Sequence, residues 1–267
     1  LRQLDPGART LLIALGVART RISLDEAHAL AGADAVRDLT RRFLVDSSRD
    51  QVMVHDLIRD AAVRSAARRE LAAGHRVLAE LYQGRGEARV DGADVVEVVH
   101  HLTRAGDLDD AWEAAQRGYG AVSAAGLHHL LLDDLRQLAG SLTSARREIG
   151  LLVVRILVRR GAIAEAADML STLPEGDGEA AVRWLLLAGE IAHRRGRLGE
   201  AEGHFRRAQA QATTRPQQMH AGFELADVST LRGFTSGART VLASITSEHA
   251  LSSPREVGRL GWSLAMS

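Results

Sequence analysis

The sequence contains no cysteine, no lysine and no asparagine. Without cysteine there is no thiol nucleophile, no disulfide and no thiolate ligand for zinc. Without lysine there is no Walker-A phosphate loop, whose lysine reaches the β- and γ-phosphates, and no amine for Schiff-base chemistry. No pairing of a nucleophile with a base, and no spacing typical of a metal site, takes their place. We therefore expect a protein without catalytic residues, without a metal and without a cofactor of its own.

Net charge and long apolar runs are also absent. Thirty-four acidic residues balance 34 arginines, and this neutrality argues against a dedicated binder of nucleic acid or anionic membranes. No run approaches the roughly 18 apolar residues of a membrane span, and the N-terminus lacks the basic and apolar regions of a signal peptide. The 267 residues, 46% of them hydrophobic, suffice for one extended core or two compact ones, and a cytoplasmic location is expected.

Both ends of the sequence suggest a larger parent protein. The chain begins with Leu1 and not with methionine, and the stretch from Trp262 to Ser267 reads as the start of another helix. We expect the chain to be part of a longer protein.

Residues 1–70 have the pattern of three helices followed by a hairpin. The first helix is predicted at Asp5-Pro6, a cap followed by the preferred first helical residue. Ser23 and Glu26 form the capping-box pattern of a second, short helix. A third is predicted to start at Asp34, where apolar residues recur at helical spacing.

The only convincing β-pattern follows these helices. Residues 44–46 and 51–54 are short apolar runs separated by the turn-like Ser-Ser-Arg-Asp sequence of residues 47–50. Three helices and one small hairpin indicate a winged-helix-like module in residues 1–70.

From residue 71 onward the pattern is helical, with a repeat punctuated by glycine. The copies begin at Gly106, Gly161, Gly196 and Gly233. An alanine follows each glycine by five positions, and an apolar residue follows it by nine; these are Ala111, Ala166, Ala201 and Ala238, then Ala115, Leu170, Phe205 and Leu242. Glycine permits the tight turn between two antiparallel helices, and alanine permits their close approach. An extra helix is expected between Leu127 and Leu138.

The copy at Gly196 resembles a tetratricopeptide repeat (TPR). Its matching small and large positions are Gly189, Gly196, Ala201, Phe205 and Ala208, whereas Leu185, Ala188 and Ala192 depart from the usual residues. The sequence therefore predicts an all-α fold, in which residues 71–267 form an α-solenoid of TPR-like hairpins that is incomplete at its C-terminus.

An ordered set of motifs resembles another group of proteins, the STAND signalling NTPases. The set begins with Val-Met-Val-His-Asp-Leu-Ile at residues 52–58 and continues through Arg68–Leu71, His75, Leu78–Leu81, His100–Leu102 and Ala105–Asp107. The order is similar to that of the winged helix and TPR-like arm in bacterial transcription regulators of the maltose-activator type.

This resemblance implies a function for the complete parent protein. Such proteins hold ADP between a P-loop domain and the winged helix, and ATP exchange opens them. His55 would then contact a nucleotide phosphate, although ADP or ATP and the nucleotide-binding domain would belong to the parent. A structural alternative is that His55 orients the strand-to-helix turn while Asp56 serves as the helix N-cap.

The helical repeat is the expected place for a protein or small-molecule signal. The first helix of each TPR-like hairpin lines the inner face of a solenoid. The residues predicted to be exposed there, and to form a partner-binding groove, are Glu148, Leu151, Arg155, Arg183, Leu186, Glu190, His193, His220, Phe223 and Asp227.

Several other polar motifs favour structural roles. The pairs His100-His101 and His128-His129 are expected to be packing or surface residues, because adjacent helical residues do not share a face. Asp109-Asp110 and Asp133-Asp134 are expected to cap helices or to face solvent. The arginines between Arg64 and Arg69 are expected on a solvated helix face.

The sequence leaves three functions open. The first is the regulatory part of a STAND-type signalling ATPase, in which the winged helix couples the signal to the nucleotide domain. The second is a TPR-like scaffold for a partner, without nucleotide coupling. The third is DNA binding through Arg37 and Arg41, which lie four positions apart on the third helix.

Overall fold

The computed structural model of the protein describes residues 3–48, 50–85 and 90–234. The chain forms two compact units, Leu1–Asp134 and Leu135–Ser267, and each is described by itself below. Over these described ranges the fold is all-α apart from one small sheet, as predicted. Within the described ranges, no helix combines the length and the hydropathy needed to cross a membrane.

The first unit begins with three helices and three short strands. In chain order these are α1 (Pro6–Val17), β1 (Ile22–Ser23), α2 (Leu24–Arg41), β2 (Asp46–Ser48), β3 (Gln51–Met53) and α3 (Asp56–Ser65). The Asp5 carboxylate accepts a hydrogen bond from the Gly7 amide at the start of α1, and Pro6 is the first helical residue. The capping box of Ser23 and Glu26 is also present, with both of its hydrogen bonds formed.

The helix α2 contains the second and third predicted helices. They are separated at Gly32, whose φ of 80° and ψ of 158° interrupt the helical backbone just before Asp34. Glycine takes this conformation at little cost, because it has no Cβ to collide with its own carbonyl.

The sheet is antiparallel and has the order β1-β3-β2. The central residue Val52 lies between Ile22 of β1 and Ser47 of β2. The predicted hairpin is present, but β1 was not expected. With only two residues, β1 is too short to show the alternation by which a strand is recognised in sequence.

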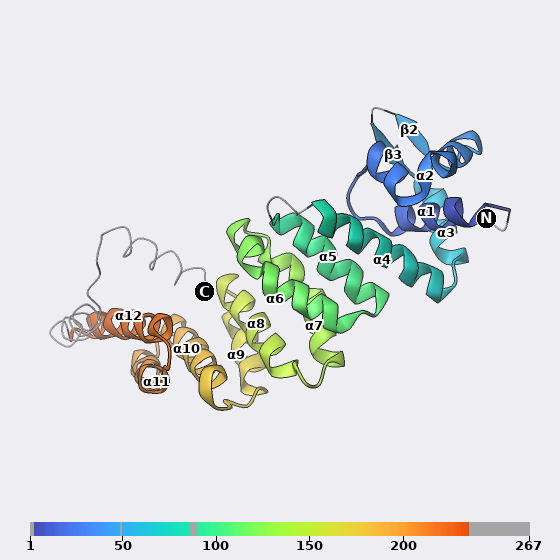
Figure 1. The fold of residues 1–267 in the computed structure, drawn as a ribbon. Helices are drawn as coiled ribbons and strands as arrows, with labels where there is room; N and C mark the ends of the chain where they lie inside the picture. Colours follow the sequence, from blue (N-terminus) through green and yellow to red (C-terminus); the bar gives the residue numbers. More distant parts are fainter. Residues whose placement is uncertain (1–2, 49, 86–89, 235–267) are drawn as a thin grey trace. The chain divides into compact units, whose positions relative to one another are not determined.

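Helices complete the first unit and continue into the second. They are α4 (Arg68–Arg85), α5 (Gly92–Ala105), α6 (Leu108–Ala124), a 3₁₀ turn η1 (His128–Leu131) and α7 (Leu132–Ser141), within which the boundary between the two units falls. Figure 1 shows α4, α5 and α6 side by side, and α4 also packs against α1. A bidentate pair between Arg9 of α1 and Glu70 of α4 joins these two helices. The sequence boundary near residue 70 therefore falls inside a compact unit.

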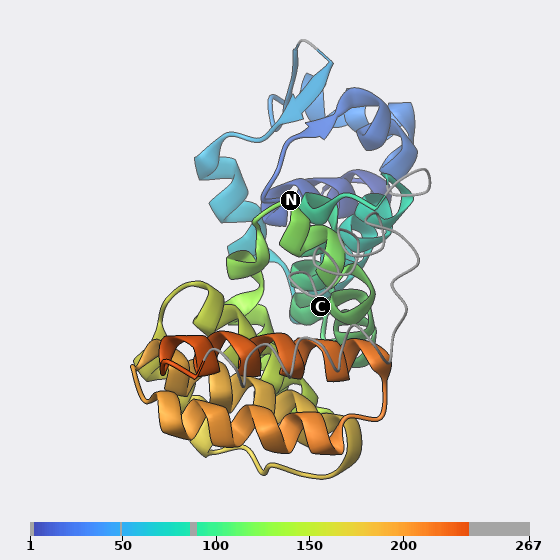
Figure 2. The same cartoon turned by 90° about the vertical axis from the view of Figure 1, so that its left-hand side faces the viewer.

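The second unit is built from successive helix pairs. Its remaining helices are α8 (Arg146–Arg159), α9 (Ile163–Ser171), α10 (Gly178–Arg194), α11 (Leu198–Gln211) and α12 (Arg215–Leu231). Each helix packs against the next: α8 on α9, α9 on α10, α10 on α11 and α11 on α12. Figure 2 shows α11 and α12, in orange, running beside each other. This nearest-neighbour packing is the organisation predicted for a helical solenoid.

The glycine positions of the repeat adopt the predicted conformation. The φ values of Gly106, Gly161, Gly196 and Gly233 lie between 74° and 90°. After each glycine, the next amide donates to a carbonyl five residues before it; examples are Asp107 to Leu102 at 3.0 Å and Arg197 to Ala192 at 2.9 Å. These bonds are those of a Schellman motif, which satisfies the free carbonyls at a helix end.

The alanine and apolar positions of the repeat are buried. The first three alanines are fully buried, and the apolar positions Ala115, Leu170 and Phe205 are at most 4% exposed. The corresponding residues of the last copy, Ala238 and Leu242, lie outside the described residues. Where the structure describes it, the repeat marks both the turns and the helix contacts.

The closest approach of α10 and α11 gives a test of this packing. A Cβ at position 189 would lie 2.5 Å from Cε1 of the buried Phe205 ring. We expect Gly189→Ala to lower the free energy of unfolding by about 1–3 kcal/mol, because the ring has no room to move. Chemical denaturation measures the effect.

The matched control is Gly203→Ala in α11. A Cβ there meets no atom within 4 Å, so this exchange should stabilise the helix by about 0.5–1 kcal/mol. Equal effects of the two substitutions would contradict the close approach at Gly189.

Candidate functional site

A pocket of about 780 Å³ lies in the first unit, among the N-terminal elements. The loop after α1, the end of α2, the sheet and the first turn of α3 all line it. Its apolar lining includes Leu15, Ile22, Val52 and Val54, and these side chains are buried or nearly so. Its polar lining consists of Arg19, Arg21, Asp46, His55, Asp56 and Arg59, with Thr20 and Thr40.

His55 stands at the point where β3 leads into α3. Its backbone is extended, and its Nδ1 accepts a hydrogen bond from the Leu57 amide at 3.3 Å, so His55 is itself the N-cap of α3. The prediction that Asp56 is the N-cap was wrong: Asp56 is the first helical residue. Because Nδ1 accepts, a neutral His55 ring carries its proton on Nε2, and this exposed ring has a donor to offer to the pocket.

Arg59 adds a guanidinium one turn further along α3. Its Nε is buried and has no hydrogen-bond partner, and its Nη1 lies 4.0 Å from the Asp56 carboxylate. The helix N-terminus adds partial positive charge. His55, the start of α3 and three arginines thus outweigh the two carboxylates, and the pocket can hold an anionic group such as a phosphate.

Large apolar side chains surround this pocket at the surface. Phe43 is 88% exposed with a φ of 57°, Met53 is 50% exposed, and both line the pocket. Leu57, next to the N-cap, is 74% exposed. An exposed group of this kind is typical of a surface that meets another molecule.

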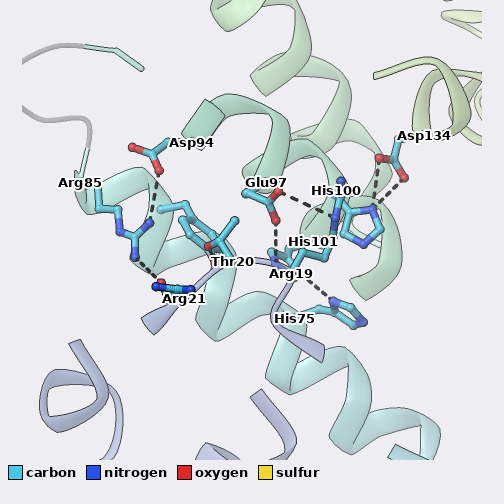
Figure 3. Close-up of polar contacts among 11 residues, drawn as sticks. Arg19, Thr20, Arg21, His75, Arg85, Asp94, Glu97, His100, His101 and Asp134 are labelled. Atoms are coloured by element: carbon cyan, nitrogen blue, oxygen red, sulfur yellow. Dashed lines mark hydrogen bonds and ion pairs between the residues drawn. The ribbon is translucent and has the colours of Figure 1, made fainter. Parts of the chain in front are cut away.

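A cluster of buried polar side chains lies between α4, α5 and α7, and Figure 3 shows its contacts. This histidine cluster consists of His75, Glu97, His100, His101 and Asp134. His101 has no exposed surface; its ring stacks on Tyr82, and its Nδ1 lies 2.8 Å from Nδ1 of His75. Its Nε2 lies 3.7 Å from Oε2 of Glu97, and neither of these two atoms has a hydrogen-bond partner.

Asp134 belongs to the same cluster and not to the surface. It is 3% exposed, and its carboxylate accepts from Nδ1 of His100 at 3.2 Å. The expectation that Asp133-Asp134 caps a helix or faces solvent was therefore wrong for Asp134, because η1 and α7 bring it against α5. Asp109-Asp110 is exposed in the first turn of α6, as expected. Among the residues described, no group of three or more candidate ligands could hold a metal.

Burial controls the charge of two of these histidines. It lowers the pKa of His75 to about 4 and that of His101 to about 3, and the charge of neighbouring histidines acts in the same direction. Both rings are therefore neutral at pH 7. Burial also raises the pKa of Glu97, against the opposing charge of Arg19.

These shifts predict a loss of stability in acid. A histidine whose pKa is lowered on folding stabilises the folded chain fully only above its unfolded pKa of 6.5. For His75 this stabilisation is lost as the pH falls from 6.5 toward 4. His101→Phe keeps the ring on Tyr82 and removes the proton site, so the free energy of unfolding should fall less between pH 7 and pH 5, by about 2 kcal/mol.

Thermal melts at the two pH values check this expectation. The variant should be less stable at pH 7, because the contact with His75 is lost, and yet show a weaker pH dependence. The surface variant His129→Phe serves as the control and should keep the pH dependence of the original chain. An unchanged dependence in His101→Phe would contradict the buried, neutral state of this ring.

A few of the predicted groove residues interact across α8, α10 and α12. His193 lies 3.9 Å from Asp227, and burial, together with the charge of Arg155, lowers the pKa of His220. Glu190 pairs with Arg194 at 3.0 Å and Glu148 with Arg147 at 3.2 Å, while Arg183 is exposed. Phe223 is 38% exposed, whereas Leu186 packs against both buried clusters of this unit.

Leu151 does not belong to an exposed face. It is 4% exposed, so its prediction as a groove residue was wrong. The buried face of α8 is wider than the repeat pattern implied, because Ile149, Val153 and Val154 beside it are buried as well.

Sequence reasoning missed Glu224, which lies among the predicted residues of α12. Its carboxylate lies 3.8 Å from Nε2 of His220. Burial, together with the charges of Glu190 and Asp227, raises its pKa to about 7. Its position four residues after His220 was a possible signal, because residues at this spacing lie on one helix face.

The raised pKa of Glu224 predicts that removing its charge stabilises the fold at alkaline pH. Its contribution to stability is complete below the unfolded pKa of 4.5 and is lost as the pH rises through about 7. Glu224→Gln should therefore raise the melting temperature at pH 8 by a few degrees and leave it unchanged at pH 4. The exposed Glu200→Gln in α11 is the control and should change neither value.

The two arginines considered for DNA binding both lie on α2. Arg37 pairs with Asp34 at 2.7 Å on the surface, and Arg41 is exposed at the end of the helix. The arginines from Arg64 to Arg69 are exposed, but they span the break between α3 and α4 and do not form one helix face.

Comparisons with known proteins find little similarity to this chain. No protein-family model and no curated protein matches the sequence. A search of solved structures finds similarity to a Signal Transduction ATPase with Numerous Domains (STAND) protein with a tetratricopeptide repeat sensor from Pyrococcus horikoshii, with 11% identity and a TM-score of 0.46. The match covers 94% of this chain and 46% of that one, so the chain spans less than half of that protein's length. At such a score the likeness carries no argument about function.

Proposed function

We propose that this chain is the regulatory portion of a STAND-type signalling NTPase. In this proposal residues 1–70 are a winged helix that meets a nucleotide held by another domain of the parent. The helical repeat receives a protein or small-molecule signal. The ordered motifs of the sequence motivate the proposal, and the geometry at His55 supports it best.

The supporting observation is that the two ring nitrogens of His55 have different hydrogen-bonding roles. Its Nδ1 is used by the Leu57 amide, which assigns the proton of the neutral ring to Nε2. That donor, the N-terminus of α3 and the unpartnered Nε of Arg59 all suit the same kind of ligand, an anionic oxygen. A phosphate of ADP or ATP in the parent fits this donor set, and His55 and Arg59 would hold it.

The partners follow from the same proposal. A nucleotide-binding domain would cover the pocket and the exposed Phe43, Met53 and Leu57 around it. The output is proposed to be transcription regulation in the cytoplasm of a bacterium. The reaction at the nucleotide would belong to that other domain, because this chain has no lysine for a phosphate loop.

Two substitutions of His55 in the full-length parent test the proposal. His55→Ser keeps an oxygen that caps α3 but removes the ring donor. His55→Ala removes both. If the ring holds a phosphate, both variants should release bound nucleotide about tenfold faster and show raised basal output, since one charge-assisted hydrogen bond contributes about 1.5–3 kcal/mol. Chromatography of the nucleotide that remains bound provides the measurement.

The capping role of His55 makes a different prediction. If the ring only caps α3, His55→Ser should retain nucleotide as the original protein does, and only His55→Ala should lower the melting temperature. That pattern would overturn the proposal.

A scaffold without nucleotide coupling is the second candidate. The mixed charged and apolar face formed by Glu190, His193, Phe223 and Asp227 favours it, because such a face can bind a peptide directly. The coding sequence upstream of Leu1 separates the two candidates. A glycine-rich loop ending in Lys-Ser or Lys-Thr would favour the signalling NTPase, and its absence would favour the scaffold.

A further inference from the structure

The short loop of residues 18–21, between α1 and β1, has contacts on two sides. All four of its residues line the pocket beside His55. The same loop is fastened to α4 and α5: Thr20 bonds the Tyr82 hydroxyl at 2.7 Å, and the Arg21 carbonyl accepts from Arg85 at 3.5 Å. Arg19 reaches Glu97 of α5, with Nε 3.8 Å from Oε1.

The carboxylate of Glu97 is nearly buried, and Arg19 is its ion-pair partner. The Glu97 side chain is 9% exposed, and its Oε2 is buried without a hydrogen-bond partner. The charged and titratable groups around it include Arg19 from the loop, Tyr82 from α4, Asp94, His100 and His101 from α5, and Asp134 from α7. His75 of α4 is linked to it through His101. Arg19 contributes the strongest charge that favours a carboxylate at this position.

We propose that Arg19 is a shared cation, which binds an anion in the pocket at the expense of its ion pair with Glu97. Anion binding in the pocket is thereby linked to the uptake of one proton by Glu97. This inference rests on the anion-binding role proposed for the pocket, and it adds a partner residue outside it. Arg19 lines the pocket and its side chain is 37% exposed, so an anion in the pocket and the Glu97 carboxylate both have access to it.

The histidine cluster provides a place for that proton. With Glu97 ionised, the proton of His101 lies on Nε2, 3.7 Å from Oε2 of Glu97, and Nδ1 of His101 accepts from Nδ1 of His75. When a proton arrives at Nε2 of the half-buried His75, His75 gives its Nδ1 proton to His101. His101 then gives its Nε2 proton to Glu97 as this separation shortens to hydrogen-bond distance. All three side chains are then neutral, and one proton has been gained.

The linkage reaches from the pocket into the helical part of the first unit. Glu97 is in the middle of α5, and α5 packs against both α4 and α6. Loss of the Arg19–Glu97 ion pair removes one of the three contacts named above between the loop and these helices. Anion binding in the pocket therefore removes the contact of this loop with α5.

Inorganic pyrophosphate is the probe, and the complete 267-residue chain is used at low ionic strength with isothermal titration calorimetry. At pH 8, Glu97→Gln should bind about threefold more tightly than the original chain, because Arg19 no longer has a competing carboxylate. This advantage should shrink in acid as Glu97 takes up its proton in the original chain, because burial raises the pKa of this carboxyl above its ordinary value. Asp94→Asn is the control and should have no such effect, because Asp94 pairs with Arg85.

A double-mutant cycle shows that the effect passes through Arg19. Arg19→Gln should weaken binding, and adding Glu97→Gln to it should change nothing further. An effect of Glu97→Gln that persists without Arg19, or no effect at pH 8, would overturn the inference. Carboxyl ¹³C NMR of the original chain gives a second readout that needs no variant: pyrophosphate should raise the pH at which Glu97 titrates, and an unchanged titration also overturns the inference.

His55→Ser separates this inference from the function proposed for the pocket. If pyrophosphate binding is lost in His55→Ser but indifferent to Glu97→Gln, only the shared cation is overturned. If the original chain binds no pyrophosphate, or binds it equally without the His55 ring, the anion site and the inference built on it both fail.

Discussion

The helix pairs of this protein depend on backbone turns that glycine makes without strain. Each of the four repeat glycines adopts a positive φ, and the residue after it donates back to the last turn of the preceding helix. The turn fixes where the next helix starts, and in the three copies that the structure describes the alanine five positions later is buried. Alanine at that position lets the backbones approach, and in two of these copies Leu170 or Phe205, one turn further on, fills the remaining space. A side chain at any of the four turns would have to adopt a left-handed backbone conformation.

Much of this architecture could be predicted because its signals are local. The capping residues Asp5 and Ser23 and the repeat itself act within a few positions of sequence, and the structure contains each as predicted. Apart from the N-cap of α3, which is His55 and not Asp56, the errors concern contacts between distant residues. Asp134 is buried because it meets His100, 34 positions earlier, and Leu151 because α8 has more than one buried face. The strand β1 exists only as a partner of β3, and two residues carry no pattern of their own.

The candidate site was predicted only where its residues belong to a local sequence motif. His55 could be singled out because it sits in a short ordered motif, but its role as the N-cap follows from ring geometry that the motif does not contain. Arg19, Arg59 and Glu97 carry no sequence signal, since each is an isolated charged residue until folding brings it to a neighbour. On α12 the repeat pattern located His220 and Asp227 but not Glu224 between them, whose behaviour depends on Glu190 of another helix. Titration behaviour is thus the property least accessible to sequence reasoning.

The cap at the start of α3 has a consequence for what His55 can offer to a ligand. Because the Leu57 amide occupies the lone pair of Nδ1, a neutral ring presents a single hydrogen, on Nε2. A ring that turned to present its other nitrogen would leave this amide without its acceptor. The direction of the donor and the first turn of the helix are therefore set by one and the same bond.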